Sequence, residues 1–163
     1  MIQRIQTVYM ALVVIFAFVA LLSTMGEWTV AGDTVASFSN FTFSASGAWA
    51  TLDSTSGPWC MGILLILVIF FTAMSILLFR KRMRQLRLVI LTTIFLVGYA
   101  ATYAVFAYYY HLNLCQVSGA GMEPVFHVKW TALLPVLSII LNCLAIQGIR
   151  KDEALVRSLD RLR

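Results

Sequence analysis

The chain has 163 residues, of which 61% are hydrophobic and only 12% are charged. Soluble domains carry about 25% charged residues, so this composition excludes an ordinary soluble fold and indicates an integral membrane protein. The formal net charge is +5, but all but one of the cations lie at residue 4, at 80–87 or at 150–163. Such patches are typical of membrane topology rather than of a nucleic-acid groove, and we expect no nucleic-acid partner.

Four apolar runs are each long enough to cross a lipid bilayer as a helix, at about 5–24, 59–79, 88–110 and 130–149. The first run also fits a cleaved signal peptide. Ser23-Thr24-Met25-Gly26 offers no Ala-x-Ala-like cleavage site, however, so we favour an uncleaved span. The sequence therefore predicts an all-α membrane protein, a four-transmembrane-helix bundle in one domain over 1–163.

The orientation of the bundle follows from Arg80-Lys81-Arg82-Met83-Arg84-Gln85-Leu86-Arg87, between the second and third runs. A cation at the bilayer centre costs about 2.5–3.5 kcal/mol on insertion scales, and clusters of cations stay in the cytoplasm. With this cluster of cations in the cytoplasm, the cytoplasmic face carries a net charge of +8 and the outer face −3. Together these give the stated +5. Both termini are then predicted to be cytoplasmic.

The outer loop at 25–58 has a strand-like composition. Aromatic and β-branched residues gather in Trp28-Thr29-Val30 and in the alternating run from Phe38 to Phe43. Ala31-Gly32-Asp33 between them has turn chemistry. We predict a small two- or three-stranded β-hairpin cap that packs on the bundle, because an isolated hairpin is marginal in water. Asn40-Phe41-Thr42 also matches the N-glycosylation tripeptide, a pattern common by chance.

The third run carries small side chains, Gly98, Ala101 and Thr102, at roughly helical spacing. We predict that they let a neighbouring helix approach closely. The run ends in Tyr108-Tyr109-Tyr110-His111, which we interpret as an aromatic belt at the membrane interface.

The four runs contain no Asp, Glu, Lys, Arg or His. Proton relays, coupled transporters and intramembrane hydrolases need such groups at depth, so we expect neither an enzyme nor a cofactor. For the buried polar residues we expect interhelical hydrogen bonds. These are Thr72, Ser75, Thr92, Thr93 and Asn142.

The sequence offers two candidate sites at the outer end. His111 and Cys115, with Glu123 and His127, could supply four ligands to zinc or copper if both pairs were helical and adjacent. No dedicated ligand-spacing motif supports this, and we favour no metal. Cys60 and Cys115 lie at comparable height on antiparallel helices and are candidates for a disulfide, provided that their Cα separation is near 5.5–6 Å.

The tail at 150–163 continues as an amphipathic helix pattern. Its apolar stripe is formed by Leu155, Val156, Leu159 and Leu162. The stripe could dock on a cytoplasmic protein partner, but we favour a helix lying on anionic lipid.

Both ends of the chain resemble a known family. Met1-Ile2-Gln3-Arg4-Ile5-Gln6-Thr7-Val8-Tyr9 and the closing run from Arg150 to Arg163 are similar to the bacterial domain-of-unknown-function family 4293 of Bacteroidota, small four-span proteins. This resemblance implies a bacterial inner membrane, argues against glycosylation of Asn40, and supplies no activity or site residue. Gly47-Ala48-Trp49 and the β-rich outer loop are vaguely similar to claudin-type proteins, but the two loop cysteines of that class are missing, so only architecture is implied.

Two classes of function remain from the sequence. The first is a non-catalytic accessory or assembly subunit, with lipid and a membrane-protein partner or a second copy as neighbours. The alternative is a lipid-binding or small-molecule-binding protein, with a site among the aromatic residues at the outer end. We favour the first, and a stoichiometric protein partner would distinguish it from the second.

Overall fold

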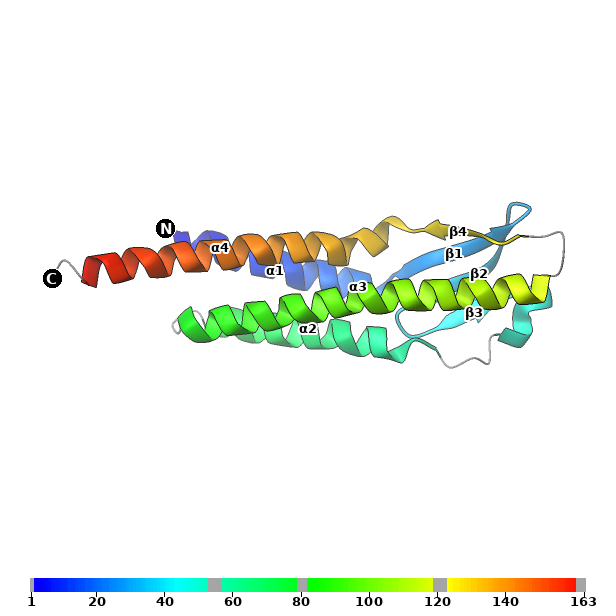
Figure 1. Cartoon of the computed structure of the whole chain (residues 1–163), viewed down its shortest axis with the longest axis horizontal. Coiled ribbons are helices and arrows are strands. Elements are labelled where there is room, and N and C mark those ends of the chain that lie inside the picture. Colours follow the sequence, from blue (N-terminus) through cyan, green and yellow to red (C-terminus); the bar gives the residue numbers. More distant parts are fainter. Residues whose placement is uncertain (1, 53–56, 79–81, 119–122, 161–163) are drawn as a thin grey trace.

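The protein is elongated, with a helical bundle at one end and a small β-sheet at the other (Figure 1). The computed structural model describes residues 2–52, 57–78, 82–118 and 123–160. The helices are α1 (Ile2–Leu22), α2 (Trp59–Leu77), α3 (Arg82–Ser118) and α4 (Leu134–Asp160), and two 3₁₀ helices are η1 (Gly47–Leu52) and η2 (Trp130–Leu133). The strands are β1 (Thr24–Val30), β2 (Asp33–Ser39), β3 (Phe43–Ala45) and β4 (Val125–Val128).

The bundle is built from neighbouring antiparallel helices. α1 packs against α2 and α4, and α3 packs against the same two helices. α1 begins and α4 ends at one end of the molecule, where α2 also ends and α3 begins (Figure 1). The cations near these helix ends, such as Arg4, Arg87 and Arg150, therefore belong to the end opposite to the sheet.

Three helices of the described chain are long and apolar enough to cross a membrane: Trp59–Leu77, Met83–Val117 and Trp130–Lys151. The apolar part of α1 is shorter, at Gln6–Leu22. α4 departs from its predicted start, since Trp130–Leu133 is a 3₁₀ turn and the α-helix begins at Leu134. Pro135 explains this boundary, because proline lacks an N–H and is best accommodated in the first turn of a helix.

The sheet is antiparallel, with strand order β3-β2-β1-β4. The β1–β2 hairpin turns at Ala31 and Gly32, which both have positive φ, at 52° and 93°. A two-residue turn of this kind favours glycine and matches the twist of the strands, so the predicted turn is confirmed. β1 alternates, with Trp28 and Val30 buried and Glu27 and Thr29 half-buried.

The sheet has one strand more than predicted, because β4 comes from the second outer loop and pairs with β1 through Trp28 opposite Phe126. The predicted strand from Phe38 to Phe43 is also interrupted. β2 ends at Ser39 and the chain turns through Asn40 before β3. Backbone pairing of Ser39 with Thr42 closes that turn.

The longest helix, α3, has 37 residues where a span of 88–110 was predicted. Its length is about 55 Å at 1.5 Å per residue, well beyond the roughly 30 Å of a bilayer core. The part beyond the other helices lies along the sheet (Figure 1). The sequence shows no breaker there, and 112–118 therefore continues as helix rather than loop.

Candidate functional site

The junction between sheet and bundle is organised by Asn40, in the turn between β2 and β3. Its side chain is fully buried. The Nδ2 group donates hydrogen bonds to the carbonyls of Ala20 at 2.7 Å and Leu21 at 3.3 Å, in the last turn of α1. The Oδ1 atom accepts a hydrogen bond of 2.8 Å from the Tyr99 hydroxyl on α3. The Asn40 amide therefore provides hydrogen-bond donors for carbonyls at the end of α1 and links α1 to α3.

The same turn is fixed to α2 through its backbone. The Gly62 N–H donates to the Asn40 carbonyl at 3.2 Å. The Phe41 ring lies so close to Gly62 that a Cβ added there would come within 2.1 Å of Phe41 Cε1. Only glycine permits this approach, so Gly62 is the position at which the turn between β2 and β3 contacts α2 most closely.

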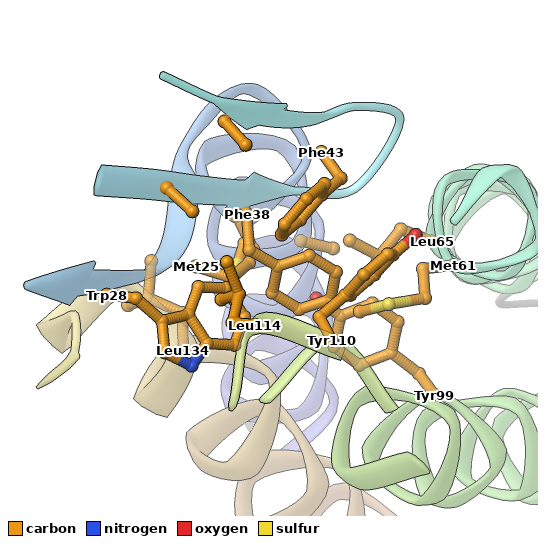
Figure 2. Packing of buried hydrophobic residues seen from close by; sticks show 14 of the residues in the cluster. Met25, Trp28, Phe38, Phe43, Met61, Leu65, Tyr99, Tyr110, Leu114 and Leu134 are labelled. Carbon is orange, nitrogen blue, oxygen red and sulfur yellow. The ribbon is translucent and has the colours of Figure 1, made fainter. Parts of the chain in front are cut away.

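An aromatic core joins the sheet to the outer part of α3 (Figure 2). Phe43 stacks on Tyr110 with ring centroids 4.1 Å apart, and Phe38 packs against Tyr103 and Tyr110 at 5.7 and 5.6 Å. Trp28 adds edge contacts with Phe38 and Phe43. Such pairs contribute about 0.5–1.5 kcal/mol each beyond their burial. We call the sheet together with residues 104–118 of α3 the outer module.

Tyr110 of the predicted aromatic belt, Tyr108-Tyr109-Tyr110-His111, belongs to this aromatic core. Tyr110 is buried under the sheet, whereas Tyr108 is 66% exposed on the opposite side of α3. The aromatic rings at the outer end pack against one another, as Figure 2 shows for Phe43 and Tyr110. A surface pocket of about 200 Å³ lies elsewhere, over Thr34–Ser37 and Ser44–Ser46 of the sheet.

A second polar cluster lies in the half of the bundle away from the sheet, around the buried Met10 sulfur. Ser75 Oγ and Gln85 Nε2 approach this sulfur at 3.5 and 3.7 Å. Nearby, Asn142 Nδ2 donates to Thr92 Oγ1 at 3.2 Å. These contacts confirm the predicted interhelical role for Ser75, Thr92 and Asn142.

The other two polar residues of that prediction bond within their own helices. Thr72 donates to the Val68 carbonyl and Thr93 to the Val89 carbonyl. A hydroxyl can always reach the carbonyl four residues earlier, so no partner helix is needed.

The proposed metal ligands do not converge. His111 Nε2 and Cys115 Sγ lie 3.8 Å apart on α3, but His127 on β4 is 3.0 Å from Thr29 Oγ1 instead. Among the residues that the structure describes, no group of three or more His, Cys, Asp or Glu side chains could hold a metal ion. The pairs are separated because the second outer loop forms a strand and not the helix that the hypothesis needed.

The sulfur atoms of Cys60 and Cys115 are not joined in a disulfide. Both side chains are exposed, Cys60 in the first turn of α2 and Cys115 in the last turns of α3.

The small-residue stripe of α3 is placed differently from the prediction. A Cβ added at Gly98 would meet nothing within 4 Å, and Ala101 is exposed. Thr102 donates to the Gly98 carbonyl of its own helix. Among the described helical glycines, those with a close neighbour at the Cβ position are Gly62, against Phe41, and Gly148, against Gln6, and neither is singled out by the sequence.

The tail is helical to Asp160, as an unbroken continuation of α4. It runs past the inner ends of the other helices (Figure 1). Leu162 of the predicted docking stripe lies outside the described residues, as do the side chains of Leu155, Val156 and Leu159.

A salt bridge joins Lys129 to Glu27 at the base of the sheet, where β4 meets β1. Both side chains are partly exposed, so the pair contributes at most about 1 kcal/mol. It links β1 to the residue that directly follows β4.

One family model matches the chain over residues 2–162, under the description Domain of unknown function (DUF4293). No curated protein matches the chain. Since the family model covers nearly all of the sequence, the protein belongs to the DUF4293 family.

Proposed function

We propose that the protein is a four-span component of a bacterial inner membrane, with both termini in the cytoplasm. Three helices have the required length and apolarity, and α1, with 21 residues, is about 31 Å long. Cations lie near the start of α1, near the start of α3 and in the last part of α4, at the end of the molecule opposite to the sheet. By the positive-inside rule that end is cytoplasmic, which places the outer module in the periplasm.

Single-cysteine labelling in intact cells tests this topology. In a cysteine-free background, a membrane-impermeant maleimide should label Ser46→Cys on the sheet and should leave Ser158→Cys unlabelled until the membrane is opened. Ser46 is exposed, so access is not limited by packing. Labelling of Ser158→Cys alone would reverse the arrangement.

Its proposed role is that of a non-catalytic accessory or assembly subunit, whose outer module is a contact surface. The observation that carries this proposal is the Asn40 junction, which fixes the module to three helices at once. A fixed module suits protein contact. The four apolar runs also lack Asp, Glu, Lys, Arg and His, and such groups mark ion and proton pathways in membranes.

The test is the protein mass of the purified particle in mild detergent, measured by light scattering with the detergent contribution subtracted. We expect a protein mass above the 18.2 kDa of one chain, in a defined stoichiometry. A particle of one chain carrying a retained lipid or small molecule would contradict an assembly role and support the binding alternative.

A further inference from the structure

Two tryptophans are exposed at the junction between the sheet and the bundle. Trp59 is the first residue of α2, and Trp130 is the first residue of η2, directly before α4. Their side chains are 63% and 69% exposed, whereas Trp28 is fully buried and Trp49 packs against the hydrophobic core. An indole combines an apolar ring with one N–H donor, and this combination is enriched where a membrane meets water.

Both exposed tryptophans lie at the level where α1 ends. In the first turn of α2, the Gly62 N–H donates to the carbonyl of Asn40, whose side chain bonds the carbonyls in the last turn of α1. Next to Trp130, the Thr131 hydroxyl donates to the Thr24 carbonyl at 2.6 Å, just past the end of α1. These contacts hold the starts of α2 and η2 at one level along the molecule (Figure 1).

The two tryptophans also lie at opposite corners of the bundle. α2 and α4 each pack between α1 and α3, so these two helices are diagonal to one another. One protein docked on one side of the bundle would cover one corner and leave the other exposed. A lipid layer surrounds the bundle and covers both corners at once.

The helix surface beside this level is apolar on every side of the bundle. Each helix has a large apolar side chain that is more than half exposed: Phe18 on α1, Phe70 on α2, Ile94 on α3 and Ile140 on α4. α2 has 19 residues and is about 28 Å long, close to the roughly 30 Å of a bilayer core. The apolar surface therefore has the length of a bilayer and faces all directions.

Charged residues begin on the sheet side of the same level. The first charge after α1 is Glu27, and the last charge before Trp130 is Lys129. These two side chains form the salt bridge between β1 and the end of β4. The exposed indoles therefore lie between an apolar surface that surrounds the bundle and the first charges of the sheet.

We infer that Trp59 and Trp130 bind the lipid interface on the sheet side of the bundle. Their rings lie at the ends of the acyl chains nearest the headgroups, and their N–H groups donate to ester or phosphate oxygens of the lipids. The membrane boundary then lies at the junction, and the sheet stands directly outside it. This inference rests on the proposed four-span role and names what contacts the bundle at this boundary.

The test is depth-dependent fluorescence quenching of the full chain in vesicles of phosphatidylcholine and phosphatidylglycerol. Trp59→Phe and Trp130→Phe each remove one exposed indole, and the emission lost with each substitution belongs to that indole. Both indoles should be quenched several-fold more by bromine near the ester end of the acyl chains than by bromine near the methyl end. Acrylamide in the water should quench them several-fold less than the ester-end bromine.

Two matched positions calibrate the depth in a chain that carries both Trp59→Phe and Trp130→Phe. Phe70→Trp lies in the middle of α2, where the native side chain is 56% exposed, and methyl-end bromine should quench it most. Val125→Trp lies on β4, where the native side chain is 55% exposed, and acrylamide should quench it most.

Stronger quenching of either native indole by acrylamide or by methyl-end bromine than by ester-end bromine would overturn the inference. Bromolipid quenching of only one of the two indoles would overturn it too, because a partner on one side would then explain the pattern. Quenching of Val125→Trp mainly by bromolipid would place the sheet within lipid and have the same consequence. If acrylamide but neither bromolipid reached the indole of Phe70→Trp, the four-span proposal itself would be contradicted.

Discussion

Replacing Asn40 with alanine is expected to lower the thermal unfolding midpoint in detergent by about 10 °C, for a loss of roughly 2–4 kcal/mol. The substitution removes the donor to the Ala20 and Leu21 carbonyls and the acceptor for the Tyr99 hydroxyl. A buried polar group left without a partner costs about 1–3 kcal/mol. The loss is large because these groups belong to three different parts of the fold.

Tyr99→Phe provides the matched control, since it removes one hydroxyl and leaves the amide bonded to α1. We expect a smaller loss, of about 1 kcal/mol. In the double variant the two effects should be less than additive, because the Asn40–Tyr99 hydrogen bond can be lost only once. Strict additivity, or an Asn40→Ala protein as stable as the wild type, would show that the junction does not depend on this amide.

The importance of Asn40 illustrates what the sequence could not reveal. In the sequence it forms part of a chance glycosylation tripeptide, whereas in the structure it is fully buried. Its partners lie 20 and 59 residues away. Hydrogen bonds over such separations depend on how the elements pack, and no local pattern encodes them. The available signal was an amide set among the aromatic residues Phe38, Phe41 and Phe43.

Other features were predictable because their causes are local. The apolar runs gave the positions of α2 and α4, and Ala31-Gly32 gave the hairpin turn because it needs positive φ. β4 was missed because its four residues, Val125–Val128, become a strand only by pairing with β1 across about 100 positions of sequence. The length of α3 was missed because the sheet, and not lipid, covers its outer part.

The glycines show the same division between local and non-local causes. Gly98 was chosen from the sequence because small residues surround it at helical spacing, yet its Cβ position faces open space. Gly62, in the first turns of α2, carries no comparable pattern and lies under Phe41. The sequence shows where a glycine could let another element approach a helix closely. Which glycine has such a neighbour is known only from the fold.

Gly62→Leu and Gly98→Leu are therefore expected to have opposite effects on the same helical bundle. Both exchanges remove a glycine from a helix, which by propensity alone favours the variant by up to about 1 kcal/mol. At Gly62 the new side chain would collide with the Phe41 ring, whose Cε1, Cζ and Cδ1 atoms lie 2.1–2.7 Å from the added Cβ. Overpacking of this kind costs about 1–3 kcal/mol and occasionally more.

The atoms that meet the added Cβ at Gly62 all belong to the Phe41 ring, and Phe41 directly follows Asn40 in the turn. The Gly62 N–H also donates to the Asn40 carbonyl. A shift of this turn away from α2 would therefore disturb Asn40 and its contacts with α1 and α3. We expect Gly62→Leu to lower the unfolding midpoint clearly and to expose the outer module to protease.

Gly98→Leu should leave the unfolding midpoint in detergent unchanged or slightly raised, because its Cβ position meets no atom within 4 Å. A loss of stability in Gly98→Leu equal to that in Gly62→Leu would place a neighbouring helix over Gly98 within one chain. Gly98 faces open space and Gly62 faces a ring, so only Gly62→Leu should lower the unfolding midpoint. The melting curves of the two variants, measured side by side, test this difference.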